Sequence, residues 1–467
     1  MTTCRLRAAS PTRHDLLLPG RVSFGIVQRN QQRYPVITSP VVIPRDQHTI
    51  SRADISPNAL KVLYRLRSAG FQAHLVGGGV RDLLLGREPK DFDVATDALP
   101  EQVKDVFRNC RLVGRRFRLA HVQFGREIIE VATFRAGQDG DEVPEHQTDE
   151  GMLLRDNVYG TIEQDALRRD FSVNALYYNI EDFSIIDYAN GVEDLKNGVL
   201  RLLGDPETRY REDPVRMLRA ARFAAKLGFR IDDDTAAPIA QLASLLREVP
   251  PARLFEETLK LFLAGTAVSC FEKLRQYGLF AHLFPDTEVC LSRLEHEFPL
   301  TLVLKGLENT DARVREDKPV TPAFLFAVMM WEPVRQGTEA LQAHGIAPLQ
   351  AIQQSAAEVI SRQLAFVSLP RRFSAPMQEI WTLQPRFQFT RGKRPQRLLA
   401  HPRFRAAYDF LLLRAAAGEA DPELAEWWTE FQDGHVEPVA EDAKPSRSGR
   451  RRRGRRGGRR KEADGAE

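Results

Sequence analysis

Cysteine is scarce in this sequence: there are four among 467 residues, and no two of them form a C-x-x-C pair. We therefore expect no zinc site, and we expect free thiols in a reducing compartment. A run of eighteen apolar residues is also lacking, so no membrane-spanning helix is predicted. The first residues, MTTCRLRAAS, lack the apolar segment of a secretory signal, which favours a cytoplasmic location.

Acidic residues are absent from 444–461, which holds eleven lysines and arginines. Three acids follow, so residues 444–467 carry a net charge of +8 and the rest of the chain about −4. Residues 433–467 are poor in apolar side chains, and we expect a disordered Arg/Gly-rich tail. Such a tail suits RNA, or anionic lipid in a peripheral membrane association. A solubilising or targeting role is the alternative.

The segment 75–97, LVGGGVRDLLLGREPKDFDVATD, reads as strand, glycine turn, short helix, loop and strand. Asp91 and Asp93 stand two residues apart, so in a strand their carboxylates project from one face. Phe92 and Val94 then face the packed side. Adjacent carboxylates repel unless a cation lies between them, and Mg²⁺ prefers oxygen ligands. The pair predicts a metal site, although a lone D-x-D is more often part of a surface turn.

Glycines precede this acidic pair. Gly77–Gly79 let a backbone approach phosphate without interference from a Cβ atom. Gly78 and Gly79 lead into a helix that carries Arg81, and a helix N-terminus favours anions. No Gly-Lys-Ser/Thr follows, so this is not a Walker A loop. A phosphate cradle followed by two acids indicates metal-assisted phosphoryl or nucleotidyl transfer.

Hydrophobic periodicity predicts the surrounding elements. We expect a poorly ordered extension with one short strand at 34–42, then helices over 55–70 and 100–107 and strands over 111–113, 119–124 and 127–134. These make a small mixed sheet. Residues 137–151 are acidic and glycine-rich, which favours a mobile loop, and the chain from 250 to about 431 reads as helices with short breaks.

Glu130 stands on the last predicted strand, on a face that also carries Ile128, Ala132 and Phe134. An acid on an apolar face is costly unless it is paired or binds a metal. The functional interpretation is a third carboxylate directed at the Asp91/Asp93 ions. The alternative is an edge strand with Glu130 in water.

The segment 165–178, DALRRDFSVNALYY, places Arg168 and Arg169 before a helix that we expect to begin near Asp170. In the structural interpretation, Asp170 is a simple N-cap and the arginines belong to a solvated turn. In the functional one, Asp170 faces the acidic cluster and the arginines hold a triphosphate, because a guanidinium fork matches phosphate oxygens.

The segment 209–229, RYREDPVRMLRAARFAAKLGF, contains the clearest helix, which starts at Pro214 and ends at Gly228. Asp213 and Arg216 are three residues apart and share a face. An acid accepts from an exocyclic amine while an arginine donates to the adjacent ring nitrogen, so the pair accepts adenine or cytosine and rejects guanine and uracil. Arg219 and Arg222 continue round the helix as further nucleotide-binding candidates. The alternative is an N-cap with a solvated basic flank.

Residues 385–405, PRFQFTRGKRPQRLLAHPRFR, interleave basic and aromatic side chains. This pattern is typical of surfaces that bind single-stranded RNA, where bases stack and phosphates require cations. A basic surface loop is the alternative.

Several of these segments together resemble a known family: GGGVRDLLLG, KDFDVAT, RRDFSVNALYY and REDPVRMLRAARFAAKLGF. They are similar to the motifs of bacterial class II nucleotidyltransferases of the DNA polymerase β superfamily, over about residues 55–285. That family contains CCA-adding tRNA nucleotidyltransferases and poly(A) polymerases. LVGRRFRLAHV at 112–122 and the basic C-terminal extension resemble the poly(A) polymerase branch.

The resemblance implies roles for matching residues. Asp91 and Asp93 match the metal-binding pair. Asp170 matches a position assigned as a catalytic acid, whereas Glu130 lies on a strand where the superfamily often has its third acid. These two assignments partly compete, and both are kept.

Nucleotide contacts are implied in the same way. Gly78, Gly79 and Arg81 match the motif that holds the triphosphate, with Arg168 as a second cation on the phosphates. Asp213 and Arg216 match the pair that reads the incoming base.

The implied fold is α+β, a small mixed-sheet nucleotidyltransferase head followed by all-α neck, body and tail domains. We assign an extension, the head, the neck, the body with the tail domain, and the basic tail to residues 1–50, 51–200, 201–265, 266–432 and 433–467. The implied activity is template-independent addition of AMP from ATP to RNA 3′ ends, with two Mg²⁺ ions, in polyadenylation that promotes mRNA decay and processing. Sequence-tolerant RNA binding, contact with RNA-decay proteins and a monomeric state accompany it.

Two alternatives stay open. A CCA-adding enzyme would use tRNA with CTP and ATP, and the Asp213/Arg216 pair does not separate it from a poly(A) polymerase. A non-enzymatic RNA-binding protein with a degenerate head is disfavoured by the intact acids.

Overall fold

The protein is described here from a computed structural model, in which residues 39–114, 118–136, 158–292 and 298–434 are described. The loop predicted at 137–151, most of the strand predicted at 34–42 and nearly all of the basic tail lie outside the described residues.

The head is built on an eight-stranded mixed sheet with the order β1-β8-β7-β2-β3-β6-β5-β4. Its strands are β1 Val41–Ile43, β2 Ala73–Val76, β3 Asp93–Thr96, β4 Cys110–Val113, β5 Leu119–Phe124, β6 Glu127–Thr133, β7 Leu176–Asn179 and β8 Ile185–Asp187. Neighbouring strands of this sheet are antiparallel except β3 and β6, which run parallel. The predicted mixed sheet is confirmed, with more strands than expected.

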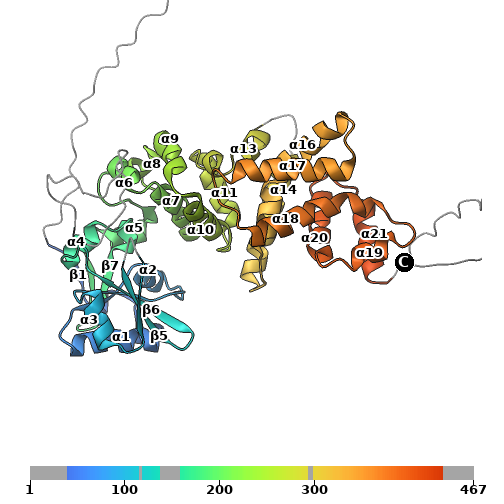
Figure 1. Ribbon diagram of the computed structural model, residues 1–467. Coiled ribbons are helices and arrows are strands. Elements are labelled where there is room, and N and C mark those ends of the chain that lie inside the picture. Colours follow the sequence, from blue (N-terminus) through green and yellow to red (C-terminus); the bar gives the residue numbers. More distant parts are fainter. Residues whose placement is uncertain (1–38, 115–117, 137–157, 293–297, 435–467) are drawn as a thin grey trace, which may run out of the picture. The chain divides into compact units, whose positions relative to one another are not determined.

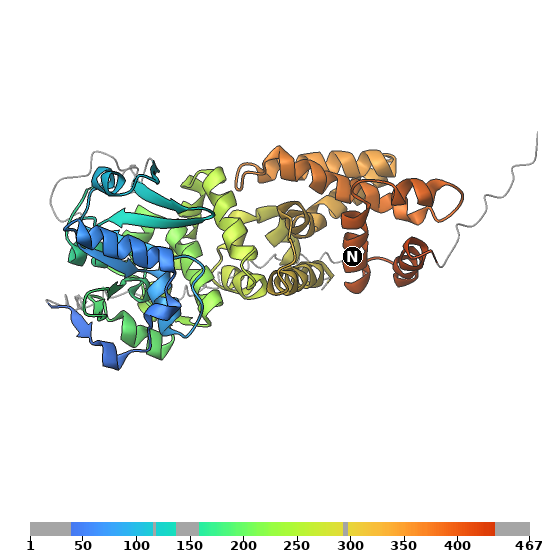
Figure 2. The same cartoon turned by 90° about the horizontal axis from the view of Figure 1, so that it is seen from below.

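Helices α1 (Pro57–Ser68) and α3 (Pro100–Val106) cover one face of the sheet (Figure 2). Helix α1 begins where Ser56 Oγ accepts from the Asn58 amide at 3.2 Å, and Pro57 occupies the first turn. Gly70 follows its end with φ +90°. The strand side chains on this face, such as Val94, are buried, so the opposite face carries the polar groups.

The opposite face has a small apolar cluster beside those polar groups. Val76, Ala95, Phe134 and Tyr177 pack with Ala166 of α4, which spans Ile162–Leu167. Asp93 follows the same alternation as Ala95, so it lies on this face at the end of the cluster. The Asp93 carboxylate therefore stands next to packed apolar side chains.

The helix predicted to begin near Asp170 is wrong. One 3₁₀ turn, η3 Ser172–Asn174, follows Asp170, and β7 then pairs with both β2 and β8. Tyr177 and Tyr178 are fully buried in that strand. Aromatic side chains suit a strand that is packed on both faces, and this tertiary burial overrides the local helical pattern.

The extension assigned to residues 1–50 is too long. Val41–Ile43 form β1 and pair with β8, and Ile50 is 1% exposed. The strand β1, within the assigned extension, is therefore part of the sheet.

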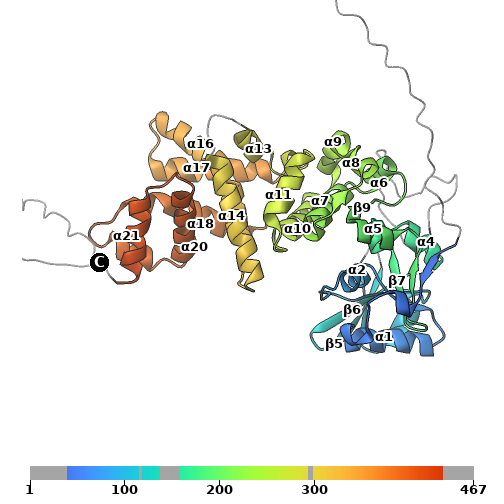
Figure 3. The ribbon, with the colours of Figure 1, turned by 180° about the vertical axis from the view of Figure 1, so that it is seen from behind.

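From residue 191 onward the described chain is almost entirely helical (Figures 1 and 3). After α2 Gly78–Leu84 in the head, the further helices are α5 Gly191–Asn197, α6 Pro206–Glu212, α7 Val215–Leu227, α8 Asp233–Ala236, α9 Ile239–Leu242, α10 Pro251–Phe262, α11 Ala267–Gln276, α12 Phe280–Leu283, α13 Pro285–Leu291, α14 Phe298–Arg315, α15 Pro322–Met329, α16 Trp331–Ala343, α17 Pro348–Gln363, α18 Arg371–Leu383, α19 Arg394–Leu399, α20 Phe404–Ala416 and α21 Pro422–Gln432. The remaining short elements are η1 Arg45–Gln47, η2 Arg52–Asp54, β9 Val199–Leu200, β10 Arg230–Ile231, η4 Ala243–Glu248 and η5 Gln384–Gln388.

The predicted α+β class, with a mixed-sheet head and a helical remainder, is confirmed. Among the described helices, none is both long and apolar enough to cross a membrane. The segment 209–229 holds two helices rather than one, because α6 ends at Glu212 and α7 begins after Asp213 and Pro214. Gly228 ends α7 with φ +75°.

Candidate active site

The acids of the predicted metal site come from two neighbouring strands. Asp93 opens β3, and Glu130 stands opposite it across the parallel pairing with β6. Asp91 precedes the strand and is exposed, so only one member of the aspartate pair is a strand residue, contrary to expectation. The predicted proximity of Glu130 to Asp93 follows from the register.

The electrostatic environment of Asp93 disfavours its charged form. Burial raises its pKa to about 6, with contributions from Glu130 and Asp91, while Arg169 acts in the opposite direction. Neighbouring carboxylates that repel one another are relieved by a bound cation. The donor set is therefore one that Mg²⁺ fits.

Glu130, which we expected to be a third metal ligand, has a histidine neighbour in this structure. Its Oε1 lies 3.5 Å from His121 Nε2 on β5. Within the described ranges, no three His, Cys, Asp or Glu side chains form a group that could hold a metal. Glu130 as a metal ligand stays a prediction.

The glycine turn packs against this acidic site. Gly77 precedes α2 with φ +74° and ψ −134°, and a Cβ atom there would lie 3.5 Å from Arg169 Nη1. A Cβ on Gly79 would lie 3.4 Å from the Asp91 carbonyl oxygen. The predicted strand, turn and helix are confirmed, and Gly79 of α2 lies next to the Asp91 backbone. Gly78 lies beside the Arg81 guanidinium.

Arg81 is buried, with 2% of its surface exposed. Its Nη2 lies 2.6 Å from Asp82 Oδ1, and its Nη1 donates to Asn174 Oδ1 at 2.6 Å. The guanidinium is thus held inside the head in this structure, where the resemblance implied contact with a triphosphate.

Asn174 continues this chain to Asp170. Its amide Nδ2 donates to Asp170 Oδ1 at 3.1 Å, and Arg219 Nε of α7 donates to Asp170 Oδ2 at 2.8 Å. Burial opposes ionisation of Asp170, but Arg219, Asn174 and the Phe171 amide outweigh it and lower its pKa to about 2. An ionised, buried carboxylate therefore links the head to the first long helix of the neck.

Arg169 is fixed by a second buried group. Its Nη2 lies 2.9 Å from Asp165 Oδ2, and its Nε donates to Tyr177 Oη at 3.0 Å. The Tyr177 hydroxyl donates to Asp165 Oδ2 at 2.6 Å. Burial lowers the Arg169 pKa, but these neighbours reverse the direction and raise it, so the side chain stays charged.

A cavity of about 420 Å³ lies beside these groups. Five arginines and three aspartates line it with two apolar residues: Leu119, Ala132, Arg135, Asp165, Arg168, Arg169, Asp170, Asp213, Arg216 and Arg219. The structure thus brings together predicted site residues from two separate segments, 168–170 and 213–219. Arg222 is not among the lining residues, and its guanidinium lies 4.6 Å from the Phe223 ring centre.

The predicted base-reading pair lines this cavity, but other side chains orient it. Asp213 Oδ2 accepts from Arg253 Nη2 at 2.7 Å. Arg216 Nη1 donates to Glu212 Oε2 at 2.8 Å and to the Arg209 carbonyl at 2.7 Å. The two side chains are therefore neighbours in one cavity, each held by a separate partner.

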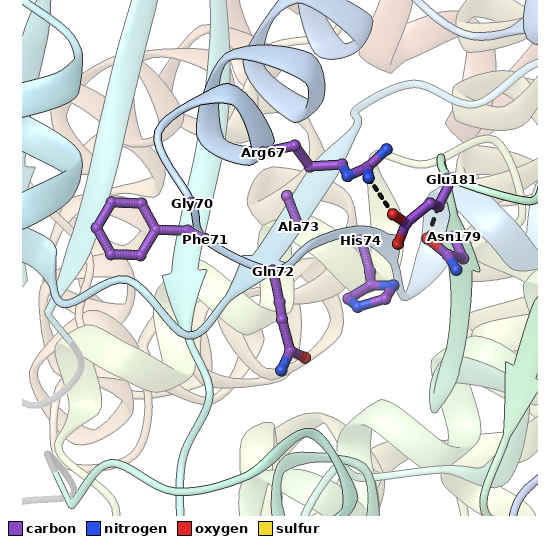
Figure 4. Close-up of a pocket in the computed structure, with 8 residues that line it drawn as sticks. All are labelled: Arg67, Gly70, Phe71, Gln72, Ala73, His74, Asn179 and Glu181. Atoms are coloured by element: carbon purple, nitrogen blue, oxygen red, sulfur yellow. Dashed lines mark hydrogen bonds and ion pairs between the residues drawn. The ribbon is translucent and has the colours of Figure 1, made fainter.

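Another cavity, of about 450 Å³, lies at the other end of β2 (Figure 4). Gln72, His74 and Asn179 line it, and Arg67 reaches across to Glu181. It contains none of the predicted site residues, whereas the arginine-lined cavity contains several, so that cavity is the candidate site.

Sequence reasoning missed the residues that hold the site together. Asn174 stands four residues after Asp170 in the RRDFSVN segment, a local signal that could have suggested contact. Arg253 is forty residues from Asp213, and no sequence signal pairs them.

Comparison with known proteins identifies the family. A model described as "Poly A polymerase head domain" matches residues 73–201. The chain is 53% identical over 398 residues to "Poly(A) polymerase I" of Salmonella typhi, covering 84% of this chain and 85% of that protein. The chain belongs to the poly(A) polymerase I family. A Haemophilus influenzae member is 51% identical over 396 residues, covering 84% of this chain and 88% of its own.

The predicted poly(A) polymerase activity, a nucleotidyltransferase reaction, is confirmed by these relatives. Two further models match the helical part: "Probable RNA and SrmB- binding site of polymerase A" at 228–291, and "Polymerase A arginine-rich C-terminus" at 344–462. A CCA-adding enzyme of Lactobacillus helveticus is 38% identical over 221 residues, which cover 47% of this chain and 53% of that enzyme. The CCA-adding alternative is therefore a distant relationship.

Solved structures agree on the fold. The Bacillus stearothermophilus CCA-adding enzyme in complex with CTP aligns with a TM-score of 0.54 and 27% identity, covering 81% of this chain and 82% of that one. A tRNA nucleotidyltransferase complexed with a primer tRNA and an incoming ATP analog aligns with a TM-score of 0.56 and 22% identity, covering 80% and 98%.

Proposed function

We propose that this polymerase adds AMP from ATP to RNA 3′ ends without a template, with its chemistry at Asp91 and Asp93 and its nucleotide in the arginine-lined cavity. The observation that carries the proposal is the meeting of residues 168–170 and 213–219 around that cavity. Five guanidinium groups against three carboxylates give the lining a net positive charge. A triphosphate is the complementary ligand.

Asp91 and Asp93 would hold Mg²⁺, with Glu130 opposite Asp93 on the neighbouring strand β6. The ion supplies charge neutralisation for the RNA 3′-oxygen and for the departing pyrophosphate when it is bound. The protein keeps these acids in place by packing: Val94 is fully buried behind Asp93, and Gly79 contacts the Asp91 backbone. Rigid support of the ligands limits reorganisation during the reaction.

Arg168, Arg216 and Arg219 would neutralise the triphosphate. Guanidinium forks bind phosphate oxygens bidentately, and fixed forks lose less entropy on binding than free ones. Arg216 and Arg219 are already oriented by Glu212 and Asp170. The cavity volume of about 420 Å³ lies within the range of small-molecule sites.

Asp170 would act by positioning rather than by moving a proton. With a pKa of about 2 it is ionised at neutral pH, and it is bound to Arg219 and Asn174. A general acid or base works best with a pKa near the working pH. The family resemblance implies a catalytic role for Asp170. We interpret this role as holding the Arg219 guanidinium in position.

Asp213 and Arg216 would read the base. Arg253 holds the Asp213 carboxylate, and Glu212 holds the Arg216 guanidinium. A carboxylate has about four acceptor positions, so this contact leaves capacity for the exocyclic amine of adenine. Adenine and cytosine share the required order of donor and acceptor, so geometry at this pair does not by itself exclude CTP.

The deciding experiment incubates the full chain with a generic RNA primer and each nucleotide separately. Long tails from ATP alone support the proposal, whereas an addition of only two residues from CTP alone, with no tail from ATP alone, contradicts it. The proposal extends to sequence-tolerant RNA 3′ ends as acceptors, a cytoplasmic monomer and RNA-decay proteins as partners.

A further inference from the structure

The chain between α18 and α20 carries cations without acids. Residues 385–405 contain seven arginines and lysines and no aspartate or glutamate. Arg403 pairs with Glu379 at 3.0 Å, and Arg405 pairs with Asp409 at 3.0 Å. The other five are exposed and have no acidic partner within the described residues: Arg386, Arg391, Lys393, Arg394 and Arg397.

The aromatic side chains of this segment fall into two classes. Phe387 and Phe404 are buried against Trp428, so the interleaved surface expected from the sequence is smaller than predicted. Phe389 is 47% exposed, and the Arg394 guanidinium carbon lies 4.8 Å from its ring centre. An exposed aromatic ring with a guanidinium over it is a stacking platform that carries charge.

The platform stands on a rigid base. The Trp428 indole Nε1 donates to the Phe387 carbonyl at 2.8 Å, two residues before Phe389. On the other side, Leu398 of α19 is buried in the same cluster. The backbone on both sides of Phe389 is therefore anchored to a buried cluster, which reduces the entropic cost of ordering this segment on binding.

We propose that Phe389, Arg394 and the four neighbouring cations, together the Phe389 patch, bind single-stranded RNA behind the 3′ end that is being extended. One base would stack on the Phe389 ring, and Arg386, Arg391, Lys393 and Arg397 would contact phosphates. The patch lies outside residues 228–291, where the RNA-binding family model matches. The inference rests on the proposed function, because the bound RNA is the polymerase substrate.

RNA fits this surface better than other polyanions do. Insertion into a lipid surface requires an apolar helical face, but α19 is six residues long and its buried side chains, Pro395 and Leu398, face the interior. A lone exposed ring among unpaired cations matches a polymer that presents bases and phosphates alternately. Sequence tolerance follows, since every base has a face that stacks.

The test compares full-length Phe389→Ala, Phe389→Trp and wild type for binding of labelled oligoadenylates of increasing length. Leu399→Ala is the matched control, because Leu399 is an exposed apolar residue of the same segment, 37% accessible. A stacked base contributes about 1–3 kcal/mol, so Phe389→Ala is expected to weaken binding of long oligomers about 5- to 150-fold. Phe389→Trp is expected to bind like wild type, and Leu399→Ala to be unchanged.

Repeating the titration at raised salt separates stacking from the charged tail. Stacking is largely insensitive to salt, whereas phosphate contacts weaken. The Phe389→Ala defect should therefore persist while overall affinity falls. Equal affinities of Phe389→Ala and wild type at every length and salt concentration overturn the proposal, as does a defect confined to anionic phospholipid vesicles.

AMP incorporation onto a short primer distinguishes this proposal from the proposed function. Phe389→Ala is expected to retain that activity, because Phe389 does not line the arginine-lined cavity. Wild-type protein that incorporates no AMP refutes the proposed function and leaves the binding comparison standing. If Phe389→Ala fails to fold, Arg394→Gln decides: it keeps the ring, and unchanged binding by this variant overturns the patch.

Discussion

The arginine-lined cavity and the Phe389 patch are both basic, but they hold their charges differently. In the cavity, Arg169, Arg216 and Arg219 are each bound to an acid. In the patch, five exposed cations have no acidic partner among the residues that the structure describes. Fixed guanidinium groups suit one ligand of defined shape, whereas free ones suit a polymer that binds in many registers. If both proposals hold, this difference separates nucleotide selection at the cavity from RNA binding at the patch.

The largest effect is expected from the acids that face the cavity side of the sheet. Asp91→Ala or Asp93→Ala should lower AMP incorporation more than about a hundredfold, because the divalent ion loses a ligand and developing charge is no longer stabilised. The melting temperature should stay close to that of wild type. Glu88→Ala, an exposed acid in the same loop, is the control. Near-normal tailing by either aspartate variant would defeat the assignment.

Breaking the link between head and neck comes next. Asp170→Asn leaves Arg219 without its acid, and we expect a loss of about 2–3 kcal/mol in unfolding free energy with a raised KM for ATP. Because Arg219 is about a third exposed, this figure lies below that of a fully buried pair. A double-mutant cycle with Arg219→Gln measures the coupling. Additive effects in that cycle would show that the pair is not energetically linked.

The free energy of unfolding should depend on pH through the Asp170 carboxylate. The pKa of Asp170 is lowered from its ordinary value to about 2, so its stabilisation is complete above about pH 4 and is lost as the pH falls toward 2. Over that window wild type should lose about 2 kcal/mol more stability than Asp170→Asn. Urea unfolding at several pH values measures this difference. Parallel losses in the two proteins would mean that Asp170 is not held as described.

A smaller effect is expected at Asn174, which joins Arg81 to Asp170. Asn174→Ala should cost about 1–2 kcal/mol, because it leaves buried polar groups short of a partner. KM for ATP should rise several-fold while kcat changes less. Asn179→Ala, on the neighbouring strand and outside this chain of contacts, should leave KM unchanged. Equal effects of the two substitutions would remove the positioning role of Asn174.

The smallest effect is expected from Lys393, and it tests most directly the difference between the cavity and the Phe389 patch. Lys393→Gln should reduce the slope of log affinity for single-stranded RNA against log salt by about 0.7, the value for one phosphate contact. KM for ATP should not change, because Lys393 does not line the nucleotide cavity. A change in KM for ATP without a change in the salt slope of RNA binding would contradict the assignment of RNA to the patch and of ATP to the cavity.

The local sequence pattern was sufficient to predict the segments in which one residue type sets both the backbone conformation and the expected chemistry. The glycine turn before α2 and the acid at the start of β3 were predicted from alternation and glycine content, and both are present. The same reasoning failed at Asp170, because the segment that follows becomes a buried strand paired with β2 and β8. Pairing with distant strands is a tertiary effect that a local helical pattern does not report.

The sequence by itself determined the kinds of residues available: oxygen donors in close register, glycines where backbones must approach, and arginines in two separate segments. Only the tertiary structure decided how the charged groups of the cavity are held, since Arg219 meets Asp170 across 49 residues and Asp213 meets Arg253 across 40. Ion pairs and buried hydrogen bonds depend on separations of a few ångströms, and the order of residues along a chain does not specify these.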